Sequence, residues 1–219
     1  MLLEYVRRKR EESLFDRVCV ATALAAARDL PGAPHLSVNV HASTLGRDQG
    51  FVPFLAGAAR EQGIEAPRVT LEIVEHAPPW DGLSFLNAIA GAREQGMSVA
   101  LDDVGLGQSN YKMILDARPD YFKLDRYFVK GAHSDVHRQA VLESVAQLAL
   151  RFGGRVVAEG VEDTADLETA MRYGIDLIQG FLFSRPLPRP DLLASGALDL
   201  TVAAPVQSQA LPTRRPAAP

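Results

Sequence analysis

Short apolar runs rich in β-branched residues alternate with longer amphipathic stretches from residue 36 onward. The apolar runs predict six strands, at residues 36–40, 69–75, 98–104, 121–126, 155–161 and 177–184. The stretches between them predict helices, at about 50–63, 80–95, 109–117, 135–152 and 163–173. Asp135 is a candidate cap for the fourth of these helices, and Gly153 is its candidate stop signal. Strands separated by such helices predict βαβ units and a parallel sheet.

Side-chain alternation within the strands distinguishes a closed barrel from an open, doubly wound sheet. In five of the six predicted strands one parity is apolar and the other is small or polar, as in Val38 and Val40 against Ser37 and Asn39. An open sheet with helices on both faces should be apolar on both, whereas a barrel turns polar groups toward its mouth. The pattern therefore favours an α/β fold, a modified TIM-type (β/α) barrel.

Such a barrel normally has eight strands, and only six are visible in this sequence. Residues 1–35 have the pattern of helices, so the predicted barrel is incomplete at its N-terminus. Either the sequence begins inside the domain or another chain fills the missing edge. The expected organisation is a partial barrel over residues 1–199 and a disordered Pro/Ala-rich tail over residues 200–219.

Charge and composition exclude several classes of partner. The net charge of −4 argues against general attraction to a nucleic-acid polymer. No apolar run approaches the ~18 residues needed to span a bilayer, so we expect no membrane segment. The single cysteine, Cys19, cannot form an internal disulfide. A reducing compartment, the cytoplasm, is the expected location.

Polar side chains gather where the predicted strands end. They are Asn39, Glu72, Glu75, Asp102, Asp103, Lys123, Asp125, Glu159, Glu162 and Gln179. In a barrel these ends converge on one mouth, and carboxylates brought close together repel unless cations or protons intervene. For Glu75, Asp125 and Glu162, a solvated strand end or a salt bridge is an equally good interpretation.

The types of donor then indicate the metal and the chemistry. Carboxylate and amide oxygens suit Mg²⁺ or Mn²⁺, whereas zinc favours His or Cys. Adjacent Asp102 and Asp103 can serve two ions, an arrangement that activates water in phosphoester cleavage. Lys123 would neutralise phosphate charge or orient the water. Gly105 and Gly107 permit a tight turn directly after the aspartate pair. The residues thus predict metal-assisted phosphodiester hydrolysis.

Six ordered segments resemble the EAL-domain cyclic di-GMP phosphodiesterases of bacterial signalling. The segments are SVNVHA (37–42), LEIVE (71–75), LDDVGLGQSN (101–110), YFKLDRYFV (121–129), VVAEGVED (156–163) and IQGFLFSRPLP (178–188). The resemblance covers about residues 10 to 188. It implies a modified eight-stranded barrel that uses Mg²⁺ or Mn²⁺ to open cyclic di-GMP to linear pGpG.

The resemblance also implies a role for each matching residue. Asn39, Glu72 and Asp102 would bind one ion, and Asp102, Asp103 and Glu159 would bind the other. Lys123, with Asp103 and Glu159, would carry the chemistry. Gln179, Glu75, Gly105 and Gly107 would support the site or the substrate. The loop after the aspartate pair couples metal binding to dimerisation in the family, so a homodimer is an implied partner, as is an upstream sensor domain.

One departure from the family pattern bears on activity. The glutamate of the Glu-Ala-Leu motif, a metal ligand in the family, would lie upstream of Met1. We therefore expect a fragment or a misassigned start, with impaired hydrolysis. The alternative is a non-catalytic module that binds cyclic di-GMP for signalling. A third reading, a Mg²⁺ barrel that stabilises an enediolate, normally needs a second basic residue, and Lys123 is the only lysine found at a strand end.

Overall fold

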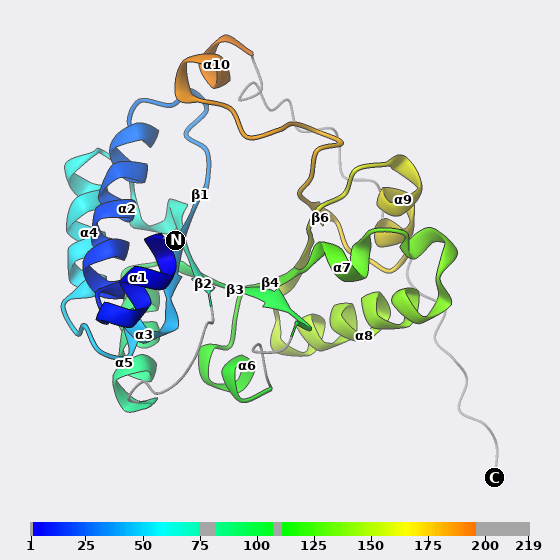
Figure 1. Ribbon diagram of the computed structural model, residues 1–219, viewed down its shortest axis with the longest axis horizontal. Coiled ribbons are helices and arrows are strands. Elements are labelled where there is room, and N and C mark those ends of the chain that lie inside the picture. Colours follow the sequence, from blue (N-terminus) through cyan, green and yellow to red (C-terminus); the bar gives the residue numbers. More distant parts are fainter. Residues whose placement is uncertain (1, 75–81, 107–110, 196–219) are drawn as a thin grey trace.

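A single parallel sheet forms the centre of the molecule. The computed structural model describes residues 2–74, 82–106 and 111–195. Within these ranges six strands pair in the order of the sequence (Figure 1). They are β1 (Leu36–His41), β2 (Val69–Val74), β3 (Ser98–Val104), β4 (Tyr121–Leu124), β5 (Arg155–Ala158) and β6 (Leu177–Ile178). The predicted number of strands and their parallel arrangement are confirmed.

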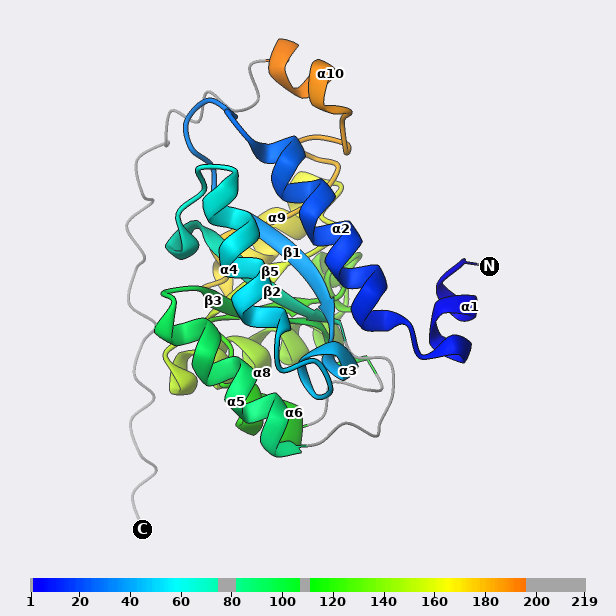
Figure 2. The ribbon, with the colours of Figure 1, turned by 90° about the vertical axis from the view of Figure 1, so that its left-hand side faces the viewer.

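Helices connect the strands and surround the outside of the curved sheet (Figures 1 and 2). The α-helices are α1 (Leu2–Lys9), α2 (Glu12–Ala27), α3 (Ala42–Leu45), α4 (Phe51–Glu61), α5 (Gly82–Glu94), α6 (Tyr111–Ala117), α7 (Arg126–Val129), α8 (Val136–Phe152), α9 (Thr164–Arg172) and α10 (Arg189–Ala194). Two 3₁₀ turns are η1 (Ala66–Arg68) and η2 (Ala132–Ser134). In the described residues β1 and β6 do not pair with each other, so the sheet is an open arc.

The sequence signals for helix α8 act as predicted. The Asp135 carboxylate accepts the backbone N–H groups of His137 and Arg138 at 2.9 and 3.2 Å. These donors have no partner within the helix, so the cap satisfies them. At the other end Gly153 adopts φ 74°, a left-handed conformation that glycine adopts without steric cost. The helix therefore begins and ends at the predicted positions.

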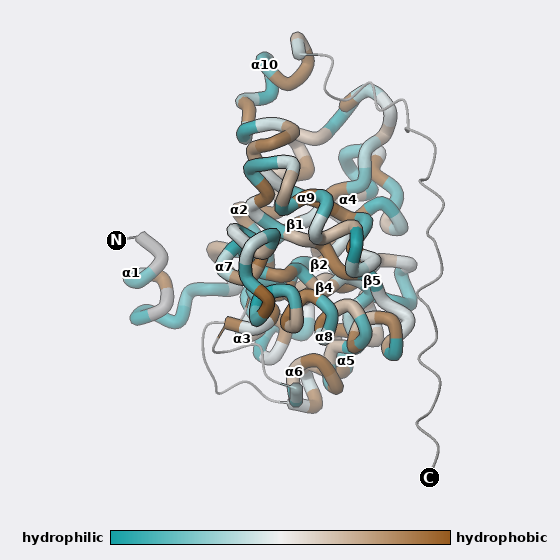
Figure 3. The backbone as a smooth tube through the Cα atoms, turned by 90° about the vertical axis from the view of Figure 1, so that its right-hand side faces the viewer, coloured by the Kyte–Doolittle hydropathy of each residue, from teal (hydrophilic) through white to brown (hydrophobic). Residues whose placement is uncertain are grey.

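The apolar parity of the strands forms the core beneath the helices. Val38 and Val40 are buried, whereas Ser37 and Asn39 on the opposite parity are exposed. Phe122 on β4 is fully buried and meets Phe152 of α8 edge-to-face, with ring centroids 6.1 Å apart. Figure 3 shows hydrophobic stretches along the strands in the middle of the molecule. Burying one face in this way leaves the other face of the arc available for polar groups.

The last two strands are shorter than the sequence pattern predicts, because two glycines redirect the chain. Gly160 has φ 66° just beyond β5. A Cβ on Gly180 would lie 2.0 Å from the carbonyl oxygen of Val161, so only glycine fits this close approach. Glu159 and Gln179 consequently follow β5 and β6 instead of lying within them. The predicted strands at 155–161 and 177–184 are therefore wrong after Ala158 and after Ile178, respectively.

The described C-terminal part crosses back toward the N-terminal helices. Arg189 of α10, a helix that the sequence pattern does not predict, donates to the carbonyl oxygens of Ala26 and Arg28 at 2.9 and 3.1 Å. The predicted tail at 200–219 and the domain boundary at 199 lie outside the described residues. Among the described helices, none has the length and apolar character needed to cross a bilayer.

Candidate metal and catalytic site

The register of the sheet places the predicted polar residues of the first three strands on one face. Asn39 of β1 lies directly opposite Glu72 of β2, and Glu72 lies opposite Ala100 of β3. Partners in a parallel register point to the same side of the sheet, as do residues two apart on one strand. Asp102 therefore shares its face with Glu72 and Asn39, near the C-terminal ends of the strands.

A β-bulge changes the direction of the strand at the two adjacent aspartates. The β3–β4 register is regular up to Leu101 and resumes at Val104, so Asp102 and Asp103 together oppose the single residue Lys123. Asp103 has φ 50°, which aspartate tolerates better than most residues. Strict alternation would turn the Asp103 side chain to the opposite face, and a bulge of this kind re-aims it.

Both aspartates consequently belong to one carboxylate cluster with Glu159. One oxygen from each of Asp102, Asp103 and Glu159 lies within 4.8 Å of the others, and the three residues are half-buried. The backbone N–H of Glu159 donates to the carbonyl oxygen of Leu124 at 3.0 Å, which continues the β4–β5 pairing by one residue. Three carboxylates at this separation form an arrangement that attracts cations.

Lys123 of β4 joins this cluster to β2. Its ammonium contacts Glu72, lies 3.2 Å from Asp102 Oδ1 and lies 2.6 Å from Glu159 Oε1. Lys123 and Glu72 are 8% and 7% exposed, so the contacts are largely shielded from solvent. The second oxygen of Glu72 accepts the hydroxyl of Ser37 at 2.6 Å. Side chains from β1 to β4 and from the residue that follows β5 thus meet in one connected polar group.

The electrostatics of this group favour further positive charge. Burial alone would lower the pKa of Lys123, but hydrogen bonds and charges from Glu159 and Glu72 outweigh it and raise that pKa. Burial raises the pKa of Glu159, and repulsion by Asp102 and Glu72 adds to the effect against the opposing influence of Lys123. The group contains four carboxylates, counting Asp103, and one ammonium. When all four carboxylates are ionised, the side chains of this group have a net charge of −3.

Gln179 lies beside the cluster, in the wall of a cavity of 320 Å³. Its backbone N–H donates to the carbonyl oxygen of Ala158 at 2.8 Å, which places it next to Glu159. The cavity is also lined by Arg126, Gly160, Glu162, Gly180, Phe181, Ser184, Arg185 and Pro186. The guanidinium of Arg185 lies 4.4 Å from the ring centroid of Phe181. A larger cavity of 480 Å³ lies between α4 and α5, away from the carboxylates.

The remaining predicted residues that the structure describes lie outside the carboxylate cluster, and each of them has a different role. Gly105 has φ 97°, and a Cβ there would lie 2.7 Å from Phe128, so the turn after the aspartates requires glycine. Glu75 and Gly107 lie outside the described residues. The Asp125 carboxylate caps α7 by accepting the N–H of Tyr127 at 2.6 Å. Glu162 forms an ion pair with Lys130 at 2.7 Å. For these last two acidic residues, the structural interpretation holds.

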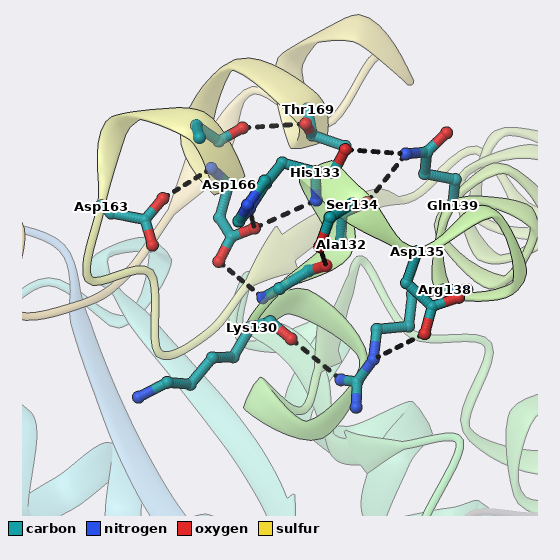
Figure 4. A network of polar contacts seen from close by, with 12 residues as sticks. Lys130, Ala132, His133, Ser134, Asp135, Arg138, Gln139, Asp163, Asp166 and Thr169 are labelled. Atoms are coloured by element: carbon teal, nitrogen blue, oxygen red, sulfur yellow. Dashed lines mark hydrogen bonds and ion pairs between the residues drawn. The ribbon is translucent and has the colours of Figure 1, made fainter.

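A second group of side chains has the same spacing as the site carboxylates. His133, Asp163 and Asp166 each offer a potential ligand atom within 4.8 Å of the others (Figure 4). Asp166, however, accepts the backbone N–H groups of Gly131 and His133 at 2.7 and 3.2 Å and pairs with His133 Nδ1 at 2.9 Å. These hydrogen bonds already stabilise the negative charge of Asp166. The group is therefore a structural link between α9 and η2.

Comparison with known proteins identifies the family. Residues 2–186 match the EAL domain. The chain belongs to the EAL-domain family. The cyclic di-GMP phosphodiesterase PA2567 of Pseudomonas aeruginosa is 32% identical over 161 residues, which cover 74% of this chain and 27% of that protein. This EAL chain thus spans about a quarter of the length of the relative.

Solved EAL structures share the fold. BlrP1 of Klebsiella pneumoniae, in complex with calcium and cyclic di-GMP, has a TM-score of 0.73 and 31% identity, over 82% of this chain and 46% of that one. BlrP1 has also been solved with manganese and cyclic di-GMP. The EAL domain of Mycobacterium smegmatis DcpA matches with a TM-score of 0.73 and 32% identity, over 82% and 80% of the two chains. The predicted α/β barrel fold is confirmed.

The donors present in this EAL domain fit Mg²⁺ or Mn²⁺. Within the described polar group the candidate ligands are the carboxylates of Glu72, Asp102, Asp103 and Glu159 and the amide of Asn39 on the same face. All of them are hard oxygen donors, which these ions prefer. Sequence reasoning missed Ser37, Arg126 and Arg185. Ser37 shares its parity with Asn39, a signal that could have identified it, whereas the two arginines are brought to the cavity only by the turns after β5 and β6.

Proposed function

We propose that this EAL domain hydrolyses cyclic di-GMP to linear pGpG with the help of two divalent cations. The observation that carries the proposal is the cluster of Asp102, Asp103 and Glu159, joined through Lys123 to Glu72. Its excess of negative charge at the strand ends, in a family whose relatives include cyclic di-GMP phosphodiesterases, supports a metal-dependent phosphodiesterase over a passive scaffold.

In this proposal the ions divide the oxygen donors between them. Asn39, Glu72 and Asp102 would hold one ion, and Asp102, Asp103 and Glu159 would hold the other. Bound Mg²⁺ or Mn²⁺ supplies Lewis acidity and lowers the pKa of water. The bulge at Asp102 and Asp103 serves this arrangement, because it gives two adjacent residues access to the same space.

Side chains of the protein then orient the reacting atoms and stabilise the charge that develops on them. The raised pKa of Lys123 keeps its ammonium protonated at neutral pH, so it acts as a positive charge and a hydrogen-bond donor and not as a base. Held among three carboxylates, it would orient the attacking water or the phosphate that gains charge. Burial raises the pKa of Glu159, which makes it a better proton acceptor than an exposed carboxylate.

The neighbouring cavity suits the rest of the substrate. Each phosphodiester of a cyclic dinucleotide carries one negative charge, and Arg126 and Arg185 place two positive charges in the cavity wall. Gln179, which also lines this cavity, offers amide donors and acceptors. The oxygen of a water molecule forms a bond to one phosphorus atom, and the bond between that phosphorus atom and one ribose oxygen breaks. The ribose oxygen takes up the proton that the water releases. The product is the opened, linear dinucleotide.

The test is to incubate the chain with cyclic di-GMP and to follow pGpG by chromatography. We expect formation of pGpG that depends on Mn²⁺ or Mg²⁺ and stops on chelation. We expect the rate to be low and to rise when a segment carrying the family's Glu-Ala-Leu strand is supplied upstream. Binding of cyclic di-GMP without turnover, even with that segment, would instead support a non-catalytic signalling module. The predicted homodimer, the upstream sensor and the cytoplasmic location stay predictions.

A further inference from the structure

A buried carboxylate occupies the core side of helix α2. The buried residues of α2 recur every three or four positions, and Asp16 takes one of these places with Val20, Leu24 and Ala27. Asp16 is only 2% exposed. Removing a carboxylate from water is unfavourable unless hydrogen bonds replace the solvent. The partners of Asp16 therefore indicate why this core position is acidic.

Both oxygens of Asp16 bind the region where β1 ends and α3 begins. Oδ2 accepts the backbone N–H of His41 at 2.9 Å and the hydroxyl of Thr44 at 2.5 Å, and Oδ1 pairs with His41 Nδ1 at 2.7 Å. A carboxylate at neutral pH only accepts, so Nδ1 of His41 carries the hydrogen. Asp16 thus holds both the main chain and the side chain of His41.

The contacts of Asp16 join the end of β1 to helix α2. Strand β1 itself pairs with β2 from Leu36 to His41. Asn39 lies two residues before His41 on β1 and opposite Glu72. A hydrogen bond to the His41 main chain fixes this strand end relative to α2. The position of Asn39 is fixed with it.

We propose that Asp16 is a positioning residue for the metal site, acting through His41 on Asn39. The inference rests on the proposed function, because it takes Asn39 as a ligand. Coordination of Mg²⁺ or Mn²⁺ tolerates only small displacements of a donor. Loss of the Asp16 contacts therefore weakens the affinity for the ion by more than a general loss of stability would.

The chain contains a matched control for this experiment. Asp166 is also 2% exposed, and it also accepts the backbone N–H and the Nδ1–H of one histidine, here His133 (Figure 4). It connects α9 to η2, and neither element contains a proposed ligand. Asp166→Asn therefore removes a buried carboxylate of the same kind without changing β1.

The experiment measures Mn²⁺ affinity by isothermal titration calorimetry and thermal unfolding without metal, on the full chain. Asp16→Asn and Asp166→Asn should each lower the midpoint of unfolding by about 5 °C or more. Asp16→Asn should raise the Kd for Mn²⁺ by about tenfold, the effect typical of a lost supporting contact. Asp166→Asn should leave that Kd unchanged. Thr44→Val, which removes one donor and keeps the carboxylate, should weaken Mn²⁺ binding in the same direction even if Asp16→Asn fails to fold.

Each outcome separates this inference from the proposed function. If the unmodified chain binds Mn²⁺ and Thr44→Val and Asp16→Asn bind it equally well, the inference is wrong and the metal site stands. Equal weakening in Asp166→Asn also overturns it, because the effect would then follow stability. If Asp16→Asn alone binds weakly but the unmodified chain makes no pGpG, the inference holds and the hydrolase proposal fails. Absence of Mn²⁺ binding by the unmodified chain overturns both.

Discussion

Two groups of acidic side chains in this EAL domain have the same spacing and opposite electrostatics. In the first group, oxygens of Asp102, Asp103 and Glu159 lie within 4.8 Å of one another, and Lys123 forms ion pairs with Asp102 and Glu159. Around Asp166 the same spacing is filled by donors of the fold, because two backbone N–H groups and an imidazole point at one carboxylate (Figure 4). Proximity of ligand atoms alone therefore does not distinguish a metal site from a structural link.

The pKa directions express this difference. Burial would raise the pKa of Asp166, but hydrogen bonds from the Gly131 backbone and from His133 outweigh it and lower the pKa. For Glu159, burial prevails over the pairing with Lys123, and the pKa is raised. Hydrogen bonds of the fold thus stabilise Asp166 in its charged form, whereas burial and the neighbouring carboxylates destabilise the charge of Glu159, which favours a cation beside it. The comparison can be tested by removing one charge at a time.

The largest effect is expected from the aspartate proposed to bridge both ions. Asp102→Asn should reduce pGpG formation by about three orders of magnitude at saturating Mn²⁺, because each ion would lose a charged ligand. The matched change in the other group, Asp163→Asn, should leave the rate within about twofold, since Asp163 only caps α9 through the Asp166 N–H. Near-normal turnover in Asp102→Asn would contradict the two-ion assignment.

The place of Asp102 on the inner face could be predicted from the sequence, whereas the place of Asp103 could not. Strand alternation assigns Asn39, Glu72, Asp102 and Lys123 to one face, and the register confirms that assignment. The same alternation directs Asp103 outward. Only the bulge and its positive φ bring Asp103 to the cluster, and neither follows from a period of two. Its proposed role rests on its adjacency to Asp102 and on the family resemblance, and neither of these predicts its position in the fold.

Helical periodicity failed in a different way at α2. The pattern predicts a helix near the N-terminus, but it counts Asp16 as a polar residue and therefore as solvent-facing. Its burial depends on donors from β1 and α3, 25 and 28 residues away in the sequence. A pattern within one element carries no information on such distant partners. The same reason explains why Arg126 and Arg185, which line the 320 Å³ cavity, were missed.

A smaller effect, on stability and not on activity, is expected from a substitution in the group of His133, Asp163 and Asp166. Asp166→Asn should lower the free energy of unfolding by about 2 kcal/mol at pH 7, because Asn accepts fewer of the available hydrogen bonds. The pKa of Asp166 is lowered in the fold, so its contribution is present above the ordinary value of 3.8 and is lost as the pH falls below it. Urea unfolding should therefore show a difference from the unmodified chain that shrinks below pH 3.8. A constant difference would mean that the charge of Asp166 is not what stabilises the link.

The smallest effect is expected at the proposed metal site, where a substitution should increase the stability of the metal-free chain instead of lowering it. Glu159→Gln keeps the shape of the side chain and removes a charge whose pKa the fold raises. When folding raises the pKa of a carboxyl group, the free energy of unfolding decreases as the pH rises through the pKa of the folded state. The charge of Glu159 therefore destabilises the unmodified chain at neutral pH. Without metal at pH 7, Glu159→Gln should be more stable to urea by about 1 kcal/mol, as is common when a strained functional group is removed. This advantage should diminish as the pH approaches 4.5 and should reverse in excess Mn²⁺, which stabilises only a chain that retains its ligands. Destabilisation of metal-free Glu159→Gln at pH 7 would show instead that the pairing with Lys123 prevails, and the contrast with Asp166 would then be lost.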